Sequence, residues 1–155
     1  MLILCLSFSV ALLDQFTKHI IRTRFALGEQ VSVIPGLFSL SYVQNTGAAW
    51  GMLQGLSHWL VIFSFLMLAV VVFFRRSFAG DGLIGRMSVG LMVAGIVGNL
   101  IDRVRLGYVV DFLHFYWRSH EFPAFNVADS AICTGVGLYL LSQILSPRPA
   151  DGPAA

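Results

Sequence analysis

The chain has 155 residues, of which 57% are hydrophobic and only 12% are charged, and its mean hydropathy is +0.79. These values lie outside the usual range of soluble domains and indicate a membrane protein that forms one compact domain. The net charge is only +2 and the ten Lys and Arg residues are scattered, which excludes the basic stripe that a nucleic-acid-binding protein needs.

The first predicted membrane-spanning helix covers about residues 1–21. A helix needs about 20 mostly apolar residues to cross the hydrocarbon core, and this segment has that length. Asp14 and Lys18 interrupt it near its end and, being spaced i, i+4, share one face. The segment has neither the basic start nor the small-residue cleavage site of a secretory signal, so we expect it to stay attached.

A longer connection follows over residues 28–51. It mixes β-branched and aromatic residues around a Pro-Gly turn, a pattern that predicts short strands. After Asn45, a run of small residues begins at Gly47. Such a run suits the close passage of a substrate or lipid chain, and it suits a simple tight turn equally well.

Two further spans are predicted in the middle of the chain. Residues 52–74 carry no charge and form the clearest span, whereas residues 83–103 are shorter and more polar. Residues 75–82 between them are rich in charge and glycine, which indicates a tight turn between antiparallel helices.

The third span carries two patterns of its own. Gly90, Ala94 and Gly98 recur every four residues, so they share a face and predict close packing against another helix. Asn99 and Arg103 follow at the end of the span, again spaced i, i+4 on a common face.

The last part of the chain repeats this arrangement of a β-rich connection followed by a helix. Residues 106–125 resemble residues 28–51 in composition and contain Asp111. The fourth predicted span, residues 126–145, begins with Asn126 and Asp129, which are spaced i, i+3.

Together these elements predict a single membrane-embedded domain over residues 1–155, an all-α fold with four spans and a small β-rich region. An even number of spans puts both termini on one side of the membrane and the connections 28–51 and 106–125 together on the other. The count of Lys and Arg on the two sides gives no orientation. We expect the tail, residues 146–155, to be disordered. A belt of interfacial aromatic residues is expected from Trp50, Trp59, Tyr108, Tyr116 and Trp117.

Charged groups at membrane depth cost a few kcal/mol each, about 3 on insertion scales, so they usually face the interior of the bundle and pair or perform chemistry. Asp111 and Asp129 fall near the same membrane surface in the four-span arrangement. Two carboxyl groups in a partly dry site do not both ionise readily, and such a pair offers a general base and a general acid together. This spacing is compatible with an aspartic protease, and also with a proton relay or a structural ion pair.

Five segments resemble the motifs of the bacterial lipoprotein signal peptidases, the signal peptidase II family, in the same order and at similar separations. They are LDQFTK at 13–18, NTGAAWG at 45–51, GNLIDR at 98–103, GYVVDF at 107–112 and FNVADS at 125–130. Trp50 and Gly51 depart from the family pattern, in which Phe and Ser are more usual.

The resemblance implies four transmembrane helices with a small extracytoplasmic β-cradle. It implies an aspartyl endopeptidase that cleaves diacylglyceryl-modified prolipoproteins before the lipidated cysteine, with Asp111 and Asp129 as the catalytic dyad. Further residues are implied to bind substrate or support the dyad: Asn45, Gly47, Asn99, Arg103, Asn126, Asp14 and Lys18. For Arg103, simple neutralisation of Asp102 or Asp129 is an equal alternative. Asp102 is expected to point elsewhere and to be secondary.

The implied partners are a lipid-modified prolipoprotein and membrane lipid, with no metal, cofactor or nucleic acid, and the protein is expected to be a monomer. The resemblance places it in the bacterial cytoplasmic (inner) membrane, with cytoplasmic termini and the dyad at the outer surface. Three alternatives remain at this point. They are a small proton-coupled transporter, a factor that binds lipidated peptides without cleaving them, and a thiol protease using Cys133 with His114 as base.

Overall fold

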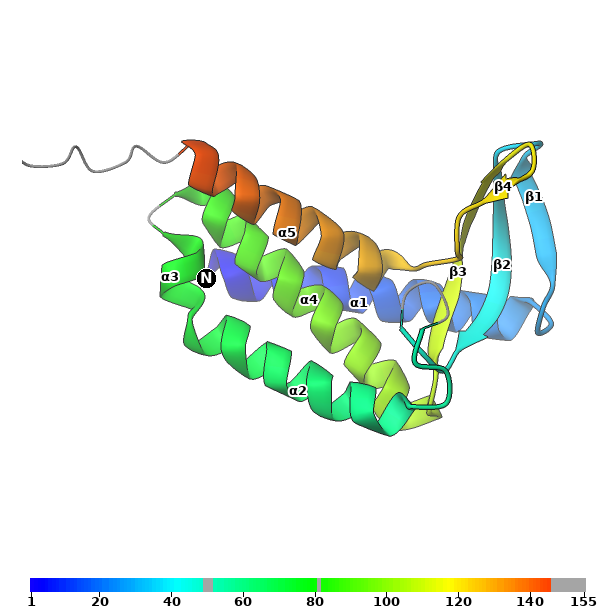
Figure 1. Cartoon of the computed structure of the whole chain (residues 1–155), viewed down its shortest axis with the longest axis horizontal. Coiled ribbons are helices and arrows are strands. Elements are labelled where there is room, and N and C mark those ends of the chain that lie inside the picture. Colours follow the sequence, from blue (N-terminus) through cyan, green and yellow to red (C-terminus); the bar gives the residue numbers. More distant parts are fainter. Residues whose placement is uncertain (49–51, 81, 146–155) are drawn as a thin grey trace, which may run out of the picture.

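The computed structural model describes residues 1–48, 52–80 and 82–145, and in these residues a helical bundle carries a small antiparallel sheet at one end (Figure 1). Trp50, Gly51 and the tail over 146–155 lie outside the described residues. The helices are α1 (Leu2–Arg24), α2 (Ser57–Phe73), α3 (Arg75–Ala79), α4 (Leu83–Leu106) and α5 (Val127–Leu145). The strands are β1 (Gln30–Ile34), β2 (Phe38–Asn45), β3 (Val109–Trp117) and β4 (His120–Glu121).

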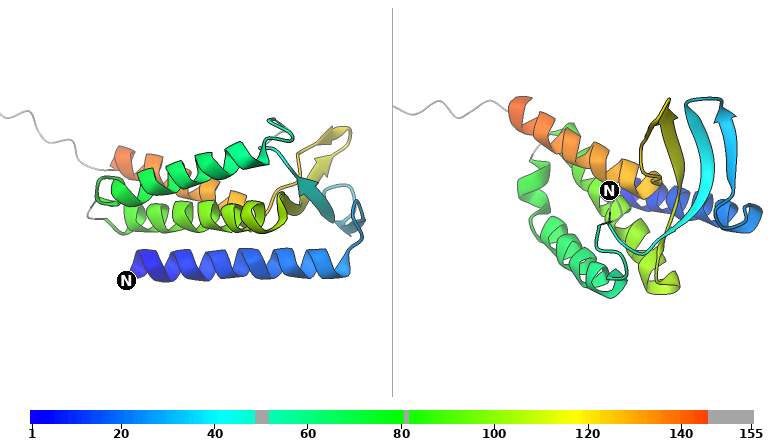
Figure 2. Two further views of the ribbon diagram at one scale, coloured as in Figure 1. Left: turned by 90° about the horizontal axis from the view of Figure 1, so that it is seen from below. Right: turned by 45° about the vertical axis from the view of Figure 1, so that its right-hand side comes forward.

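Helices α1, α2, α4 and α5 run along the length of the bundle, and α1 lies directly beside α4 (Figure 2). Among the described residues, α1, α4 and α5 are long and apolar enough to cross a membrane. Helix α2 has 17 residues, at the lower limit of a span. The N-terminus lies at the end of the bundle opposite the sheet, and α5 runs back toward that same end (Figure 1).

Several predicted boundaries differ from the structure. Helix α2 begins at Ser57 rather than at residue 52, and the predicted turn over 75–82 contains the short helix α3. Helix α4 continues to Leu106, where Gly107 ends it. Gly107 has a φ of +82°, a left-handed conformation that glycine adopts without steric cost, and its N–H donates to the Arg103 carbonyl at 3.0 Å.

The close packing predicted for the small residues of α4 is confirmed. A Cβ atom at Gly90 would lie 3.0 Å from a methyl carbon of Leu6, and one at Gly98 would lie 2.6 Å from a carboxylate oxygen of Asp14. Both glycines therefore let α1 approach α4. Gly95 performs the same role toward α5, where a Cβ would meet the backbone of Ala128, and the predicted pattern had not included it.

The sheet joins the two β-rich connections, which the four-span arrangement had placed on the same side of the membrane. Its strand order is β1-β2-β3-β4, all antiparallel, and Val43 of β2 lies opposite Asp111 of β3. A cluster of buried side chains fixes the sheet to the end of α1: Ile21, Tyr42, Val110 and Phe112. The short strand β4 was not predicted. This packing presents one surface of β2 and β3 toward the first turn of α5 and the end of α4.

Candidate active site

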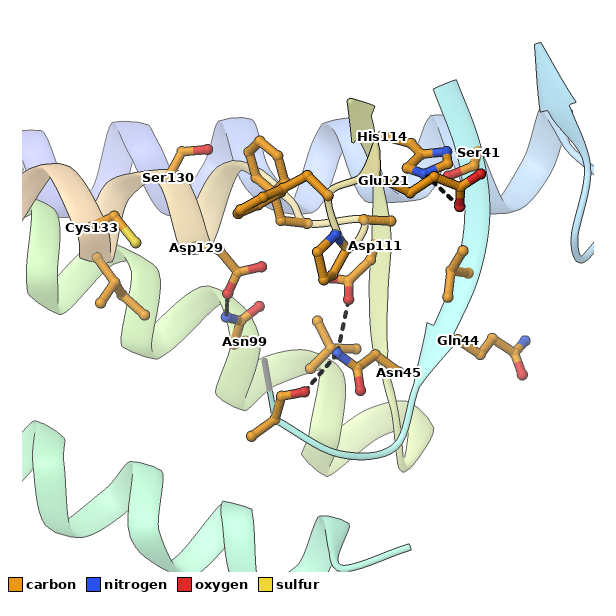
Figure 3. A pocket seen from close by; sticks show the side chains of 18 of the residues that line it. Ser41, Gln44, Asn45, Asn99, Asp111, His114, Glu121, Asp129, Ser130 and Cys133 are labelled. Atoms are coloured by element: carbon orange, nitrogen blue, oxygen red, sulfur yellow. Dashed lines mark hydrogen bonds and ion pairs between the residues drawn. The ribbon is translucent and has the colours of Figure 1, made fainter. Parts of the chain in front are cut away.

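A cavity of about 1070 Å³ lies where the sheet meets the ends of α4 and α5. Its lining includes residues of β1, β2 and β3 on one side and of α4 and α5 on the other. Asp111 projects into it from β3 and Asp129 from α5 (Figure 3). We call these two residues the carboxyl pair.

Asp111 is 2% exposed and is held by two side-chain amides. Asn45 Nδ2 donates to Asp111 Oδ2 at 3.0 Å, and Asn126 Nδ2 donates to Asp111 Oδ1 at 2.7 Å. Burial, followed by the nearby charge of Asp129, raises the pKa of Asp111 to about 7, although the two amide hydrogen bonds oppose the rise. Asp111 therefore retains its proton in part at neutral pH.

Asp129 sits in the first turn of α5, where its position follows from the local sequence. Asn126 is the N-cap, and its Oδ1 accepts the backbone N–H of Asp129 at 2.9 Å. Asp129 Oδ2 in turn accepts the backbone N–H of Asn126 at 3.2 Å, which completes a reciprocal capping box. Asn99 Nδ2 donates to the other oxygen, Oδ1, at 2.7 Å. Asn126 thus contacts both members of the carboxyl pair.

Arg103 and Gly47 organise the loop at the edge of the cavity. Arg103 Nη2 donates to the Gly47 carbonyl at 3.2 Å, and the Gly47 N–H donates to Asn45 Oδ1 at 2.9 Å. A side chain at Gly47 would collide with the backbone carbonyl of Met52. Gly47 therefore serves a tight turn of the chain itself, the second of the two interpretations that its sequence allowed.

Arg103 does not neutralise a carboxylate by direct contact. Within the described part of the chain it forms no ion pair, and Asp102 is paired with Lys18 instead. The Arg103 guanidinium lines the same cavity as the carboxyl pair, and Asp129 and Asp111 are the charges that act on it most strongly. It supplies positive potential to the cavity from a short distance.

Asp14, Lys18 and Asp102 form a second group, which we call the buried ion cluster. Lys18 Nζ lies 2.9 Å from Asp14 Oδ2 and 3.1 Å from Asp102 Oδ2, and all three side chains are at most 3% exposed. Asp102 Oδ2 also accepts the backbone N–H of Val110 at 3.0 Å. As expected, Asp102 points away from the face of Arg103: α4 turns it toward α1, where it is not secondary but a member of this cluster.

Two hydrogen bonds connect the buried ion cluster to residues next to the carboxyl pair, Asn99 and Ala128. Lys18 Nζ donates to Asn99 Oδ1 at 3.0 Å, and Asn99 is the residue that holds Asp129. Asp14 Oδ1 accepts the backbone N–H of Ala128 at 2.8 Å, which satisfies one of the free donors at the start of α5. Asp14 and Lys18 therefore fix the helix end that carries Asp129.

Such a site suits proton transfer between the two carboxyl groups and a molecule held in the cavity that they line. Both are held mainly by neutral amides, which orient the oxygens without the strong stabilisation of the charged form that a direct ion pair would give. Cys133 and His114 also line the cavity, but they lie on opposite sides of it (Figure 3). That separation argues against the thiol-protease alternative, which needs a thiol and a base in hydrogen-bond contact.

A family model described as "Signal peptidase (SPase) II" matches residues 6–145, which include the whole of this site. The chain belongs to the signal peptidase II family. It is 44% identical over 148 residues to the lipoprotein signal peptidase of Symbiobacterium thermophilum, covering 96% of this chain and 97% of that one. It is 45% identical over 145 residues to the lipoprotein signal peptidase of Syntrophotalea carbinolica, covering 92% and 90% of the two chains.

A solved structure described as a bacterial membrane enzyme, determined by the in meso method, is 35% identical and superposes with a TM-score of 0.83. It covers 92% of this chain, and this chain covers 87% of it. The resemblance to signal peptidase II is therefore confirmed, and the relatives lend no support to a transporter.

Two site residues of this signal peptidase II were not singled out from the sequence. Gln15 Nε2 donates to Asp102 Oδ1 at 3.0 Å and to the Gly98 carbonyl at 3.1 Å, and Asp102 completes the buried ion cluster. The sequence did contain a signal for them, because Gln15 and Asp102 are polar residues inside predicted spans, next to Asp14 and Arg103. Polar side chains at membrane depth require partners, and these two meet across the α1–α4 contact.

Proposed function

We propose that Asp111 and Asp129 are the catalytic carboxyl groups with which this signal peptidase II cleaves its substrate. The observation that carries the proposal is that both carboxyl groups line one cavity and are hydrogen-bonded to the same residue, Asn126. In addition, the pKa of Asp111 is raised to about 7. A pair in which one acid keeps its proton near neutral pH can supply a base and an acid in the same reaction.

The roles follow from the environments of the two acids. Asp129 is less buried than Asp111, and as carboxylate it removes a proton from a water molecule that attacks the scissile carbonyl. Asp111, in its protonated form, donates a hydrogen bond to the carbonyl oxygen and then helps to protonate the leaving amine. Asn45, Asn99 and Asn126 keep the carboxyl oxygens oriented through this exchange.

The relatives are named lipoprotein signal peptidases, which supports a prolipoprotein as the substrate of this chain. We propose that this substrate carries a diacylglyceryl-modified cysteine and that cleavage occurs before this residue. The cavity supports a lipidated substrate because apolar side chains of α5 and of the segment between β4 and α5 line it, among them Ile132, Phe122 and Phe125. These surfaces suit acyl chains next to a polar peptide site.

The chain is proposed to cross the membrane four times, with α2 as the shortest crossing. The N-terminus and the end of α5 lie at one end of the bundle and the sheet at the other, which supports an even number of crossings. The termini are then cytoplasmic, in the inner membrane, and the carboxyl pair faces the outer surface, where prolipoproteins arrive. The active unit is proposed to be the monomer, since residues of one chain supply the complete site.

The decisive experiment compares a diacylglyceryl-modified precursor with its unlipidated counterpart, using purified protein and a gel-shift readout. We expect cleavage of the lipidated form alone. The reactions contain EDTA, because a carboxyl pair activates water without a metal ion. Equal cleavage of both precursors would contradict the proposed lipid requirement, and inhibition by EDTA that zinc reverses would contradict the carboxyl mechanism.

A further inference from the structure

A second cavity, of about 320 Å³, lies between α1 and α4 and shares no lining residue with the cavity of the carboxyl pair. Two of its lining residues, Lys18 and Asp102, belong to the buried ion cluster. Its other polar residues on the outer side include His19, Arg22 and Arg105, all exposed. The catalytic proposal uses none of these three.

The charges of this second cavity do not balance. Lys18 forms ion pairs with Asp102 at 3.1 Å and with Asp14 at 2.9 Å, so the buried ion cluster holds two carboxyl groups and one ammonium group. Arg22 and Arg105 remain, one in the last turn of each helix, and neither forms an ion pair within the described residues. Two arginines from neighbouring helices therefore line one small cavity, a combination that suits a phosphate group.

The side chain of Arg22 is held in part by residues at the sheet. It interacts with the hydroxyl groups of Tyr42 and Tyr108, which lie 3.3 Å apart. These contacts hold the guanidinium near the start of β3 without removing its charge. The basic side of the cavity is thus anchored at the sheet end of the bundle, the end that reaches the membrane interface.

The apolar lining points to a lipid rather than to a soluble anion. Leu12 and Phe16 are 58% and 60% exposed, and they precede Arg22 on α1. Ten residues of helix separate Leu12 from Arg22, which at the rise of an α-helix is about 15 Å, or about half of the hydrocarbon thickness. The surface therefore runs from two guanidinium groups at the interface to apolar side chains deep in one leaflet.

We propose that this cavity binds an anionic phospholipid, with its phosphate between Arg22 and Arg105 and one acyl chain along Leu12 and Phe16. Basic pockets between transmembrane helices bind such headgroups in general. The lipid would lie against Lys18, whose ammonium group also contacts Asn99.

Native mass spectrometry of the full chain in neutral detergent tests this proposal by titration with phosphatidylglycerol and phosphatidylcholine. We expect phosphatidylglycerol to bind about tenfold more tightly or better, since each basic residue near a headgroup contributes. A parallel arm adds inorganic phosphate. Competition by phosphate at millimolar concentration would overturn the choice of a lipid and indicate a site for a free anion.

The variant R22Q/R105Q is expected to lose the preference for phosphatidylglycerol. The matched control R24Q/R118Q removes the same charge from exposed arginines at the same end of the molecule that do not line the cavity, and it should keep the preference. Because Arg22 also contacts two tyrosines, the single variant R105Q provides a second test that leaves these contacts intact, and a partial loss is expected. Equal lipid preference in R105Q and in the control would overturn the proposal. The readout is independent of proteolysis.

Discussion

The buried ion cluster and the carboxyl pair lie on two faces of the same end of α4, and they differ in how their charges are compensated. In the cluster, Lys18 contacts two carboxylates directly, and backbone N–H groups supply further donors. In the carboxyl pair, amides of Asn45, Asn99 and Asn126 take the place of a cation. A direct ion pair supported by backbone donors fixes a structure, whereas carboxyl groups held only by neutral amides beside an open cavity can exchange a proton.

The largest expected effect is on the rate of catalysis, and it belongs to the carboxyl pair. Asp111→Asn and Asp129→Asn are each expected to lower the rate of precursor cleavage by at least about 10³-fold, because an amide does not exchange the proton. Purified variants are compared on the lipidated precursor by gel shift.

The melting temperature of each variant serves as the control, since asparagine keeps an oxygen acceptor and about the same volume. A variant that stays folded and retains a rate within about tenfold of the parent would remove that residue from the proposed pair.

The second effect concerns stability and belongs to the buried ion cluster. Lys18→Met is expected to lower the free energy of unfolding by about 3–5 kcal/mol, because it leaves two buried carboxylates without their cation. The measurement is a detergent-denaturation titration in mixed micelles.

Arg24→Met on the same helix is the matched control, because Arg24 is exposed and has no part in the cluster. Adding Asp102→Asn to Lys18→Met should recover part of the loss by removing one stranded charge. If Lys18→Met is as stable as the control, the contrast between the two regions does not hold.

The smallest effect is a shift in pH dependence. With the pKa of Asp111 raised to about 7, kcat/KM is expected to fall as the pH rises above about 7, where Asp111 loses the proton that it donates. The Asn45 hydrogen bond stabilises the ionised form and lowers this pKa. Asn45→Ala should therefore move the fall in kcat/KM to higher pH.

Gln44→Ala is the control for this profile, because Gln44 lines the same cavity but donates to Tyr42 rather than to a carboxyl group. Its midpoint should match that of the parent. A midpoint that moves to lower pH in Asn45→Ala would contradict the role given to this amide.

Much of the fold was predictable because hydropathy and helical spacing are local properties. The long apolar runs predicted the positions of α1, α4 and α5, and the four-span arrangement put the two β-rich connections on one side of the membrane, where they form one sheet. The start of α2 at Ser57 was not predicted, because residues 52–56 are apolar enough to continue a span but form turns. Hydropathy does not distinguish these two conformations.

The candidate site was predictable in its members but not in its division into two regions. Consecutive residues of a helix point about 100° apart, so Asp102 faces α1 while Arg103 faces the cavity. Which of the two directions meets Lys18 depends on the rotation of α4 against α1. Close contact at Gly90 and Gly98 sets that rotation, and it is a tertiary property.

The capping box at the start of α5 has a consequence for biosynthesis. Asn126 caps the N-terminus of α5 and also donates a hydrogen bond to Asp111 of β3. Asp14, near the beginning of the chain, ties down the same helix end. On the proposed mechanism, the nascent polypeptide therefore has no proteolytic activity until α5 has been synthesised and inserted.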